Sequence, residues 1–131
     1  MVRSSRIVLD TNILVSAFFW EGNESEILRK CREHHYKLIL SPEILDELEK
    51  VLKLKFKVPK ARISDYIKEI LMFSEIVFPP GELDIIKDDP TDNIILETAL
   101  MGNANILITG DKHLLKQKQY KKLRIKKACD I

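Results

Sequence analysis

The chain has 131 residues, enough for one domain with a sizeable hydrophobic core and too few for two ordinary domains. Hydrophobic residues make up 45% of it and charged residues 32%, which is the balance of a soluble globular protein. No apolar run approaches the roughly 18 residues that a membrane span needs. The formal net charge of +2 is too small to indicate a partner by itself. We expect a single domain, residues 1–131, without membrane association.

The cysteines and histidines show no spacing that carries chemistry. Cys31 and Cys129 lie far apart, without CxxC or Cys/His ligand spacing, which argues against a zinc site and a disulfide framework. The histidines lack the HExxH spacing of metal-binding helices, and we expect surface positions for all of them: His34, His35 and His113. The basic first residues are followed by a short strand-like run and no cleavage site, so a cytoplasmic location is expected.

The first half of the chain alternates strand-like and helix-like segments. Residues 7–9 are a run of aliphatic residues that suits a buried strand. Helices are expected at 13–20 and 24–34, followed by a second strand at 37–40. A third helix, about 42–56, has strong start signals, because a serine precedes a proline at its first position.

The second half continues the alternation. A helix at 64–73 leads to a strand at 75–78, and a helix with proline at its first position runs from 90 to about 101. The remaining predicted elements are a buried strand at 106–108, a short helix at 112–117 and an edge strand at 123–125. Alternation of this kind is typical of an α/β domain with a mainly parallel sheet.

Two acids follow the predicted buried strands. Asp10 comes directly after the strand at 7–9, and Asp111 comes shortly after the strand at 106–108. Ligands of open α/β sheets bind outside the carboxyl ends of the strands, so these two carboxylates are expected to lie close together. The alternative is that Asp10 or Thr11 only caps the helix that follows.

Helical geometry adds further candidates. At 100° per residue, Asp92 points along the apolar stripe of its helix, where a solvated acid does not belong. Asp89 is more simply an N-cap, and Asp46 a surface acid. Glu47 and Glu49 lie just outside opposite edges of the apolar arc of their helix, and helical angle alone does not choose between them.

Several carboxylates in one pocket repel one another unless a cation lies among them. Oxygen ligands suit Mg²⁺ or Mn²⁺, and such an ion activates water for attack on a phosphodiester. Basic runs that contain no acid cover residues 50–64 and 112–127, and they could hold backbone phosphates or simply be solvated surface. The candidate RNA-binding cations are Lys50, Lys53, Lys112 and Lys116.

Four segments together resemble a known family. They are Leu-Asp-Thr-Asn at 9–12, Ser-Pro-Glu-Ile-Leu-Asp-Glu-Leu at 41–48, Asp-Pro-Thr-Asp-Asn at 89–93 and Thr-Gly-Asp-Lys-His-Leu-Leu at 109–115. In this order they resemble the successive motifs of PIN-domain ribonucleases, and most closely the branch of VapC-like toxins. The resemblance covers essentially the whole chain, which makes it more specific than any single motif.

The resemblance implies a three-layer α/β/α sandwich with a mainly parallel sheet of four or five strands. It implies that the metal-binding and catalytic acids are Asp10, Glu47, Asp92 and Asp111, and it thereby selects Glu47 over Glu49. Polar residues that orient these ligands would be Thr109, Thr11 and Asn12, with an outer role for Asp89 left open. It also implies Mg²⁺ or Mn²⁺, single-stranded RNA as substrate, a homodimer and a cognate antitoxin.

Two other functions compete with the ribonuclease. A phosphatase with an aspartyl nucleophile at Asp10 would resemble haloacid-dehalogenase enzymes, but those have a second acid two positions on, where this chain has Asn12. A PIN-like domain that binds RNA or protein without catalysis is the other, and retention of four mutually repelling acids argues against it.

Overall fold

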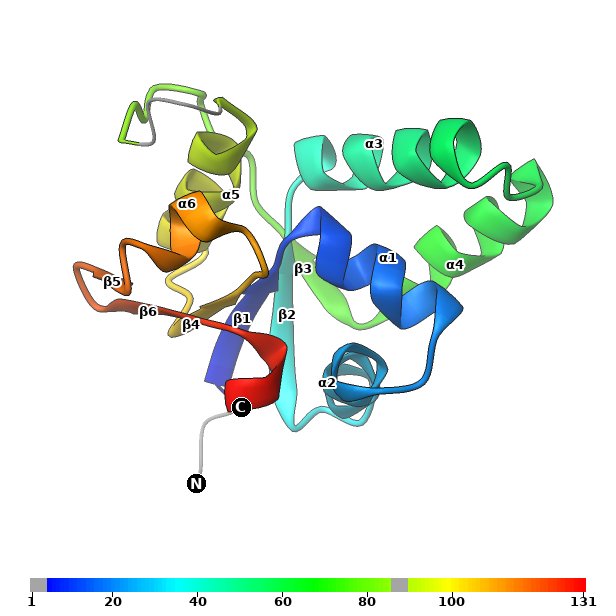
Figure 1. Cartoon of the computed structure of the whole chain (residues 1–131), viewed down its shortest axis with the longest axis horizontal. Helices are drawn as coiled ribbons and strands as arrows, with labels where there is room; N and C mark the ends of the chain where they lie inside the picture. Colours follow the sequence, from blue (N-terminus) through cyan, green and yellow to red (C-terminus); the bar gives the residue numbers. More distant parts are fainter. Residues whose placement is uncertain (1–4, 86–89) are drawn as a thin grey trace.

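The computed structural model describes residues 5–85 and 90–131, which form a six-stranded sheet between two groups of helices (Figure 1). The strands lie in the order β3-β2-β1-β4-β6-β5. They are β1 (Ser5–Leu9), β2 (Tyr36–Leu40), β3 (Ser74–Ile76), β4 (Ile106–Ile108), β5 (Gln119–Tyr120) and β6 (Leu123–Lys126). All neighbouring pairs are parallel except β5 and β6. The predicted α/β fold with a mainly parallel sheet is therefore confirmed.

The strand order reverses between β1 and β4. From β1 the chain continues through β2 to β3 on one side, and β4 then pairs with β1 on the other side. The two strands are in register with Leu9 opposite Ile108, so both end at the same edge of the sheet. In open α/β folds this reversal is where a crevice for ligands forms.

Helices cover both faces of the sheet. They are α1 (Thr11–Phe19), α2 (Asn23–Arg32), α3 (Pro42–Lys50), α4 (Lys60–Met72), α5 (Pro90–Met101) and α6 (Lys112–Leu115), with a π-helical segment η1 (Val51–Lys55) and a final 3-10 turn η2 (Ala128–Asp130). Figure 1 shows α5 and α6 on one side of the sheet and α1 to α4 on the other, which gives the expected three layers. Among the described residues, none of these helices combines the length and the apolar character that crossing a bilayer requires.

The central strands are buried because they pack against helices on both faces. Val8, Leu9 and the aliphatic residues of β2 have no exposed surface. Gly102, between α5 and β4, lies so close to this layer that a Cβ there would approach the Ile39 side chain to 2.4 Å. Burial of aliphatic side chains at about 25 cal/mol per Å² is the main stabilising contribution to such a core.

Apart from shifts of element ends by one or two residues, the structure differs from the sequence-based expectations mainly at three places. Helix α4 begins four residues earlier than predicted, directly after Pro59, whose fixed φ suits the residue before a helix. The helix predicted at 42–56 changes to π-helical geometry at Val51. The strand expected at the sheet edge, β6, is instead covered by the two-residue β5, which also raises the strand count from the expected four or five to six.

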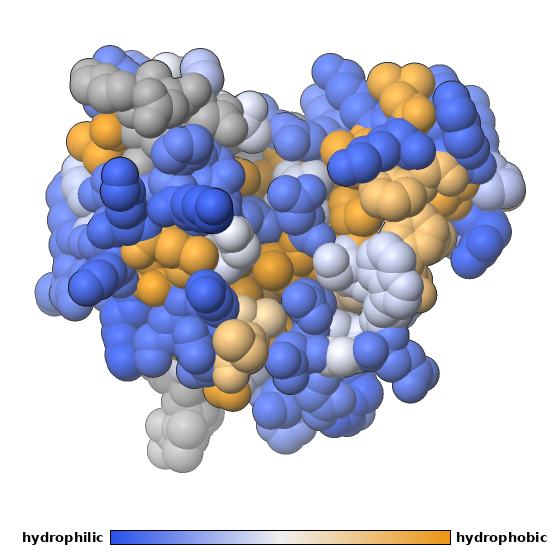
Figure 2. Space-filling model, viewed as in Figure 1, coloured by the Kyte–Doolittle hydropathy of each residue, from blue (hydrophilic) through white to orange (hydrophobic). Residues whose placement is uncertain are grey.

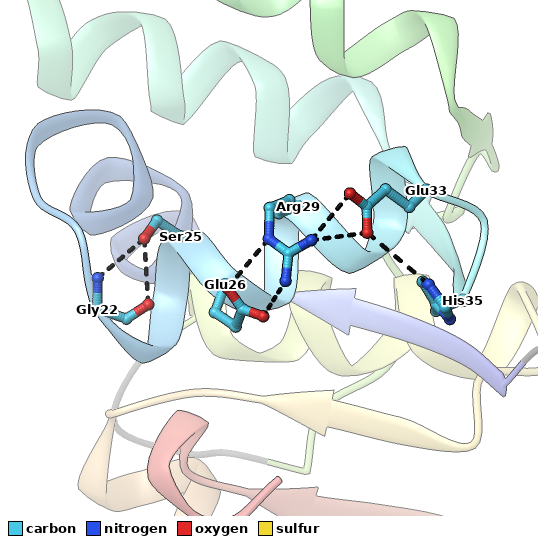
Figure 3. A network of polar contacts seen from close by, with 6 residues as sticks. All are labelled: Gly22, Ser25, Glu26, Arg29, Glu33 and His35. Carbon is cyan, nitrogen blue, oxygen red and sulfur yellow. Dashed lines mark hydrogen bonds and ion pairs between the residues drawn. The ribbon is translucent and has the colours of Figure 1, made fainter.

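The outer surface of α2 carries a network of charges, shown in Figure 3. The Arg29 guanidinium donates to the carboxylates of Glu26 and Glu33, one helical turn to either side, and the Glu33 carboxylate is also 3.8 Å from His35 Nε2. Ser25 Oγ accepts a hydrogen bond from the Gly22 N–H at the start of the helix. Each acid of this network thus has a basic side chain beside it, and all of these charges are solvent-exposed.

Candidate metal centre

Asp10 lies at the end of β1, where its carboxylate has two roles. It is the N-cap of α1, and its Oδ1 accepts a hydrogen bond from the Ile13 N–H at 3.0 Å. Its Oδ2 accepts a hydrogen bond from the Thr109 hydroxyl at the end of β4. The cap is therefore Asp10 and not Thr11, which is the first residue of the helix. Capping does not account for the second contact, since Thr109 belongs to another strand.

Thr109 links the acids that follow the two strands. Its side chain is fully buried, and besides donating to Asp10 its Oγ1 accepts a hydrogen bond from the Asp111 N–H at 3.0 Å. Asp111 in turn caps α6, accepting the His113 N–H at 2.8 Å. One hydroxyl thus fixes both acids, which are about a hundred residues apart in the chain. The expected meeting of Asp10 and Asp111 at one edge of the sheet is what the structure shows.

Asp92 joins this group from the first turn of α5. It is only 4% exposed, as its inward helical angle predicts. His113 Nδ1 is 3.9 Å from Asp92 Oδ2 and 3.4 Å from Asp111 Oδ1. Within the described part of the chain, ligand atoms of these three residues lie within 4.8 Å of one another.

His113 is a member of the cluster that the sequence did not indicate. Its side chain is about half exposed, consistent with the expected surface position, yet its imidazole faces two of the acids. Its position two residues after Asp111, in the first turn of a helix that Asp111 caps, is the signal that could have located it.

Glu47 and Glu49 line different cavities in the structure. Glu47 lines a cavity together with Thr11 and Thr91, the sequence neighbours of Asp10 and Asp92. Glu49 lines a different cavity, between α3, η1 and α4, together with Lys53 and Lys60. Of these two cavities, the one lined by Glu47 also includes the sequence neighbours of Asp10 and Asp92. Figure 2 shows the surface notched between the side of the molecule that carries α3 and the side that carries α5.

The electrostatics of Asp10 differ from those of a solvated acid. Burial raises the pKa of the Asp10 carboxyl above its ordinary value of 3.8, and the negative charge of Asp111 acts in the same direction. The hydrogen bonds from Thr109, Ile13 and the Asn12 backbone oppose this rise without cancelling it. The site therefore favours a positive charge among its acids.

The residues present fit a hard divalent cation. Asp92 and Asp111 supply carboxylate oxygens that lie close together, Asp10 lies near enough for the charge of Asp111 to act on it, and Glu47 lines a cavity with the sequence neighbours of Asp10 and Asp92. The Thr11 hydroxyl, also buried here, has no hydrogen-bond partner among residues 5–85 and 90–131. An unsatisfied buried hydroxyl beside several carboxylates is a polar environment suited to a hydrated ion.

Side chains of α5 anchor the loop that leads towards this helix, and the sequence did not indicate them. The buried Glu97 carboxylate accepts hydrogen bonds from the backbone N–H groups of Gly81, Glu82 and Leu83, at 2.7, 3.1 and 3.2 Å. Asn93 Oδ1 accepts the Ile85 N–H at 2.8 Å. These bonds hold the preceding loop against the helix that supplies Asp92.

The remaining predicted residues are dispersed. The Asn12 side chain is exposed, and only its backbone N–H acts on Asp10. Asp89 lies outside the described residues. All four candidate RNA-binding lysines are exposed; Lys50 lines a shallow cavity with Glu43 and Glu47, whereas Lys53 lines the separate cavity of Glu49. Lys112 and Lys116 lie on or next to α6, beyond Asp111.

Comparison with known proteins agrees with this fold. A family model described as PIN domain matches residues 6–113. Among solved structures, the chain is similar to the crystal structure of VapBC2 from Rickettsia felis bound to a DNA fragment from their promoter, with a TM-score of 0.63 and 23% sequence identity. That match covers 92% of this chain and 96% of the other, and at this identity it supports the fold alone. No curated protein sequence matches the chain.

Proposed function

Because the chain belongs to the PIN domain family, we propose that it is a metal-dependent endoribonuclease that hydrolyses phosphodiesters of single-stranded RNA. The observation that carries the proposal is the acidic group at the strand-order reversal of the sheet, where Asp92 and Asp111 cluster and Thr109 links Asp111 to Asp10. Asp10 and Asp111 each cap a helix, but capping does not offset the repulsion among the clustered acids, which a bound cation would relieve. This also separates the proposal from a PIN-like domain that only binds RNA or protein.

Asp10, Glu47, Asp92 and Asp111 would hold Mg²⁺ or Mn²⁺. When bound, the cation supplies Lewis-acid polarisation of a phosphodiester and activation of water. Thr109 keeps Asp10 and Asp111 in place through its two hydrogen bonds. Polar partners of this kind typically affect metal affinity or activity by about 10- to 100-fold. Thr11, with its unsatisfied hydroxyl, would orient water at the site.

The exposed lysines would hold the RNA backbone. Lys50, one turn after Glu47 on α3, and Lys112, next to Asp111, lie nearest in sequence to the acids, and Lys53 and Lys116 extend the two basic runs. Cations that neutralise phosphates make binding weaker as salt rises.

As a biological role we propose the toxin component of a toxin-antitoxin pair, acting in the cytoplasm, with a protein antitoxin and a second copy of the chain as partners. This role follows from the resemblance of the four sequence motifs to VapC-like toxins, and the chain shares its fold with a chain of the VapBC2 structure. Expression of the wild-type chain in a bacterial host should then arrest growth, and expression of the Asp10→Asn variant should not.

The decisive experiment is RNA cleavage by wild type and Asp10→Asn in Mn²⁺ or Mg²⁺, with sequencing of the new ends. Wild type should cut and the variant should not, and EDTA should abolish the activity of wild type. Asparagine keeps an oxygen that can cap α1, so the variant is expected to fold, which circular dichroism verifies. Equal cleavage by both proteins would refute the proposal.

A further inference from the structure

A small cavity adjoins the acidic centre between the first turns of α3 and α5. Its volume is about 210 Å³. Its apolar walls are Ile44 of α3 and Pro90, Ile94 and Ile95 of α5, and it shares Glu47 with the proposed metal site. On the proposed function, an occupant of this cavity would lie beside the phosphate that reacts at the metal site.

The polar side chains of the cavity are carboxylates and hydroxyls. Among the described residues that line it, the polar side chains are two carboxylates, Glu43 and Glu47, and two threonine hydroxyls. One of these threonines, Thr11, is only 3% exposed, and its hydroxyl has no hydrogen-bond partner within the described ranges. No lysine, arginine or amide side chain of the described residues contributes to the lining. The described lining therefore presents the carboxylates as acceptors, and the two hydroxyls as groups that can accept or donate.

The size of the cavity suits a single small group. At about 210 Å³ the cavity is smaller than the pockets of about 300–1,000 Å³ that hold drug-sized ligands. Aliphatic walls suit the faces of an aromatic ring, and carboxylates at the rim suit its N–H groups. Bases of single-stranded RNA are read in this way, splayed out and hydrogen-bonded along an edge.

Building on the proposed ribonuclease function, we propose that this cavity binds one base next to the cut phosphodiester, and that Glu43 selects guanine there. Guanine presents two neighbouring donors, N1–H and the N2 amino group, which match the two oxygens of one carboxylate. Uracil presents a single N–H flanked by carbonyl oxygens that a carboxylate repels. Adenine and cytosine each present one amino group beside an acceptor nitrogen.

Glu43 is suited to select the base because it is not needed for the metal. It is exposed and lies one helical turn before Glu47, on the same side of α3. Glu47 would be engaged by the cation, which leaves Glu43 as the carboxylate available to the base. Glu49, on the same helix but lining another cavity, is a matched control.

The test is cleavage of a random-sequence RNA pool in Mn²⁺ by wild type, Glu43→Gln and Glu49→Gln, with sequencing of the new ends. Wild type should prefer guanine to uracil at one position beside the cut, by roughly 5- to 150-fold, the range of a bidentate contact between a side chain and a base. A glutamine offers one acceptor and one donor, so Glu43→Gln should lose this preference and gain cleavage at the other three bases. Glu49→Gln should keep the wild-type preference.

A second measurement does not depend on cleavage. Asp10→Asn, with and without Glu43→Gln, is titrated with short RNA oligomers that differ only by guanine or uracil at the selected position. Tighter binding of the guanine oligomer that disappears with Glu43→Gln supports the inference. Guanine preference that survives Glu43→Gln, or wild-type cleavage without base preference, overturns it and leaves the ribonuclease function standing. Absence of any cleavage by wild type instead overturns the proposed function, and the titration then decides whether the cavity reads a base.

Discussion

The molecule contains two clusters of acids whose electrostatic surroundings are opposite. On the surface of α2, Glu26 hydrogen-bonds Arg29, and this contact lowers the pKa of the Glu26 carboxyl below its ordinary value. At the carboxyl ends of β1 and β4, burial raises the pKa of Asp10, and the nearest charge that acts on it belongs to Asp111, another acid. The first cluster contains its own cation, and the second is suited to receive one from outside.

The difference indicates which cluster is functional. Exposed ion pairs such as that of Glu26 and Arg29 contribute little, because water and salt screen them. Buried acids with raised pKa values destabilise a fold, and they persist where a ligand or a reaction uses them. Changes in the two clusters should therefore have effects of different kinds, and the expected effects are given below from the largest to the smallest.

The largest effect should come from Glu47, compared with Glu49 on the same helix. Glu47→Gln removes a proposed metal ligand and should reduce RNA cleavage by more than the roughly 10- to 100-fold typical of residues behind the ligands. Glu49→Gln should leave cleavage within about twofold of wild type, since Glu49 faces a different cavity. Initial rates at several Mn²⁺ concentrations measure both. Equal losses in the two variants would mean that the cavity lining does not identify the ligand.

An intermediate effect is expected at Thr109. Thr109→Val keeps the shape of the side chain but removes the hydroxyl that contacts Asp10 and Asp111. Affinity for Mn²⁺, measured by calorimetry, should fall by about 10- to 100-fold. Thr109→Ser retains the hydroxyl and should restore most of the affinity. If serine and valine behave alike, the methyl packing of Thr109 matters more than its hydrogen bonds.

A smaller effect is expected at Asp10, where substitution should increase the stability of the metal-free protein, whereas the changes above reduce a function. The raised pKa means that folded protein binds this proton more tightly than the unfolded chain does. The free energy of unfolding contributed by Asp10 therefore increases as pH falls through the raised pKa towards 3.8, and above the raised pKa the ionised group destabilises the metal-free fold.

Asp10→Asn, which does not titrate, should thus be more stable than wild type at neutral pH in EDTA, and the difference should shrink on acidification. Urea unfolding of both proteins from about pH 3 to about pH 8 gives the two curves. Added Mn²⁺ should stabilise wild type and leave the variant much less changed. A variant less stable than wild type at neutral pH would show that the capping and Thr109 contacts of the carboxylate outweigh its desolvation.

The smallest effect is expected on α2. Arg29→Ala should raise the pKa of the Glu26 carboxyl back towards 4.5, which an NMR titration of the side chain follows. Cleavage and thermal stability should stay close to wild type, because the network is exposed and lies away from the acidic centre. A large loss of cleavage would contradict the division between the two clusters.

The sequence predicted the parts of the site that follow from strand ends and helical periodicity. Parallel strands end at one edge of a sheet, so the order of the predicted elements is enough to place Asp10 and Asp111 together. The inward angle of Asp92 agrees with its burial. Helical angle did not decide between Glu47 and Glu49, because both lie just outside the apolar arc; the family resemblance selects Glu47, and the two residues line different cavities.

Other features had no local signal. His113 is an exposed residue whose contact with Asp92 depends on how α6 packs beside α5, which periodicity does not encode. The β5 strand was missed because it has two residues, and the turns around it place Lys118 and Lys121 at positive φ, a conformation that normally calls for glycine or asparagine. The hydrogen-bond partners of Glu97 are backbone N–H groups of a loop, and no pattern of side chains in the sequence predicts such contacts.

The pairing of β1 with β4 has a consequence for synthesis of the protein. A ribosome makes Asp10 about a hundred residues before Asp111, and Thr109 fixes the two acids only after β4 has added to β1. Until the segment with β4 and Asp111 has been made, the nascent chain therefore has no complete acidic centre. A protein proposed to cut RNA is assembled on an RNA template, and this strand order delays its activity until that segment has been translated.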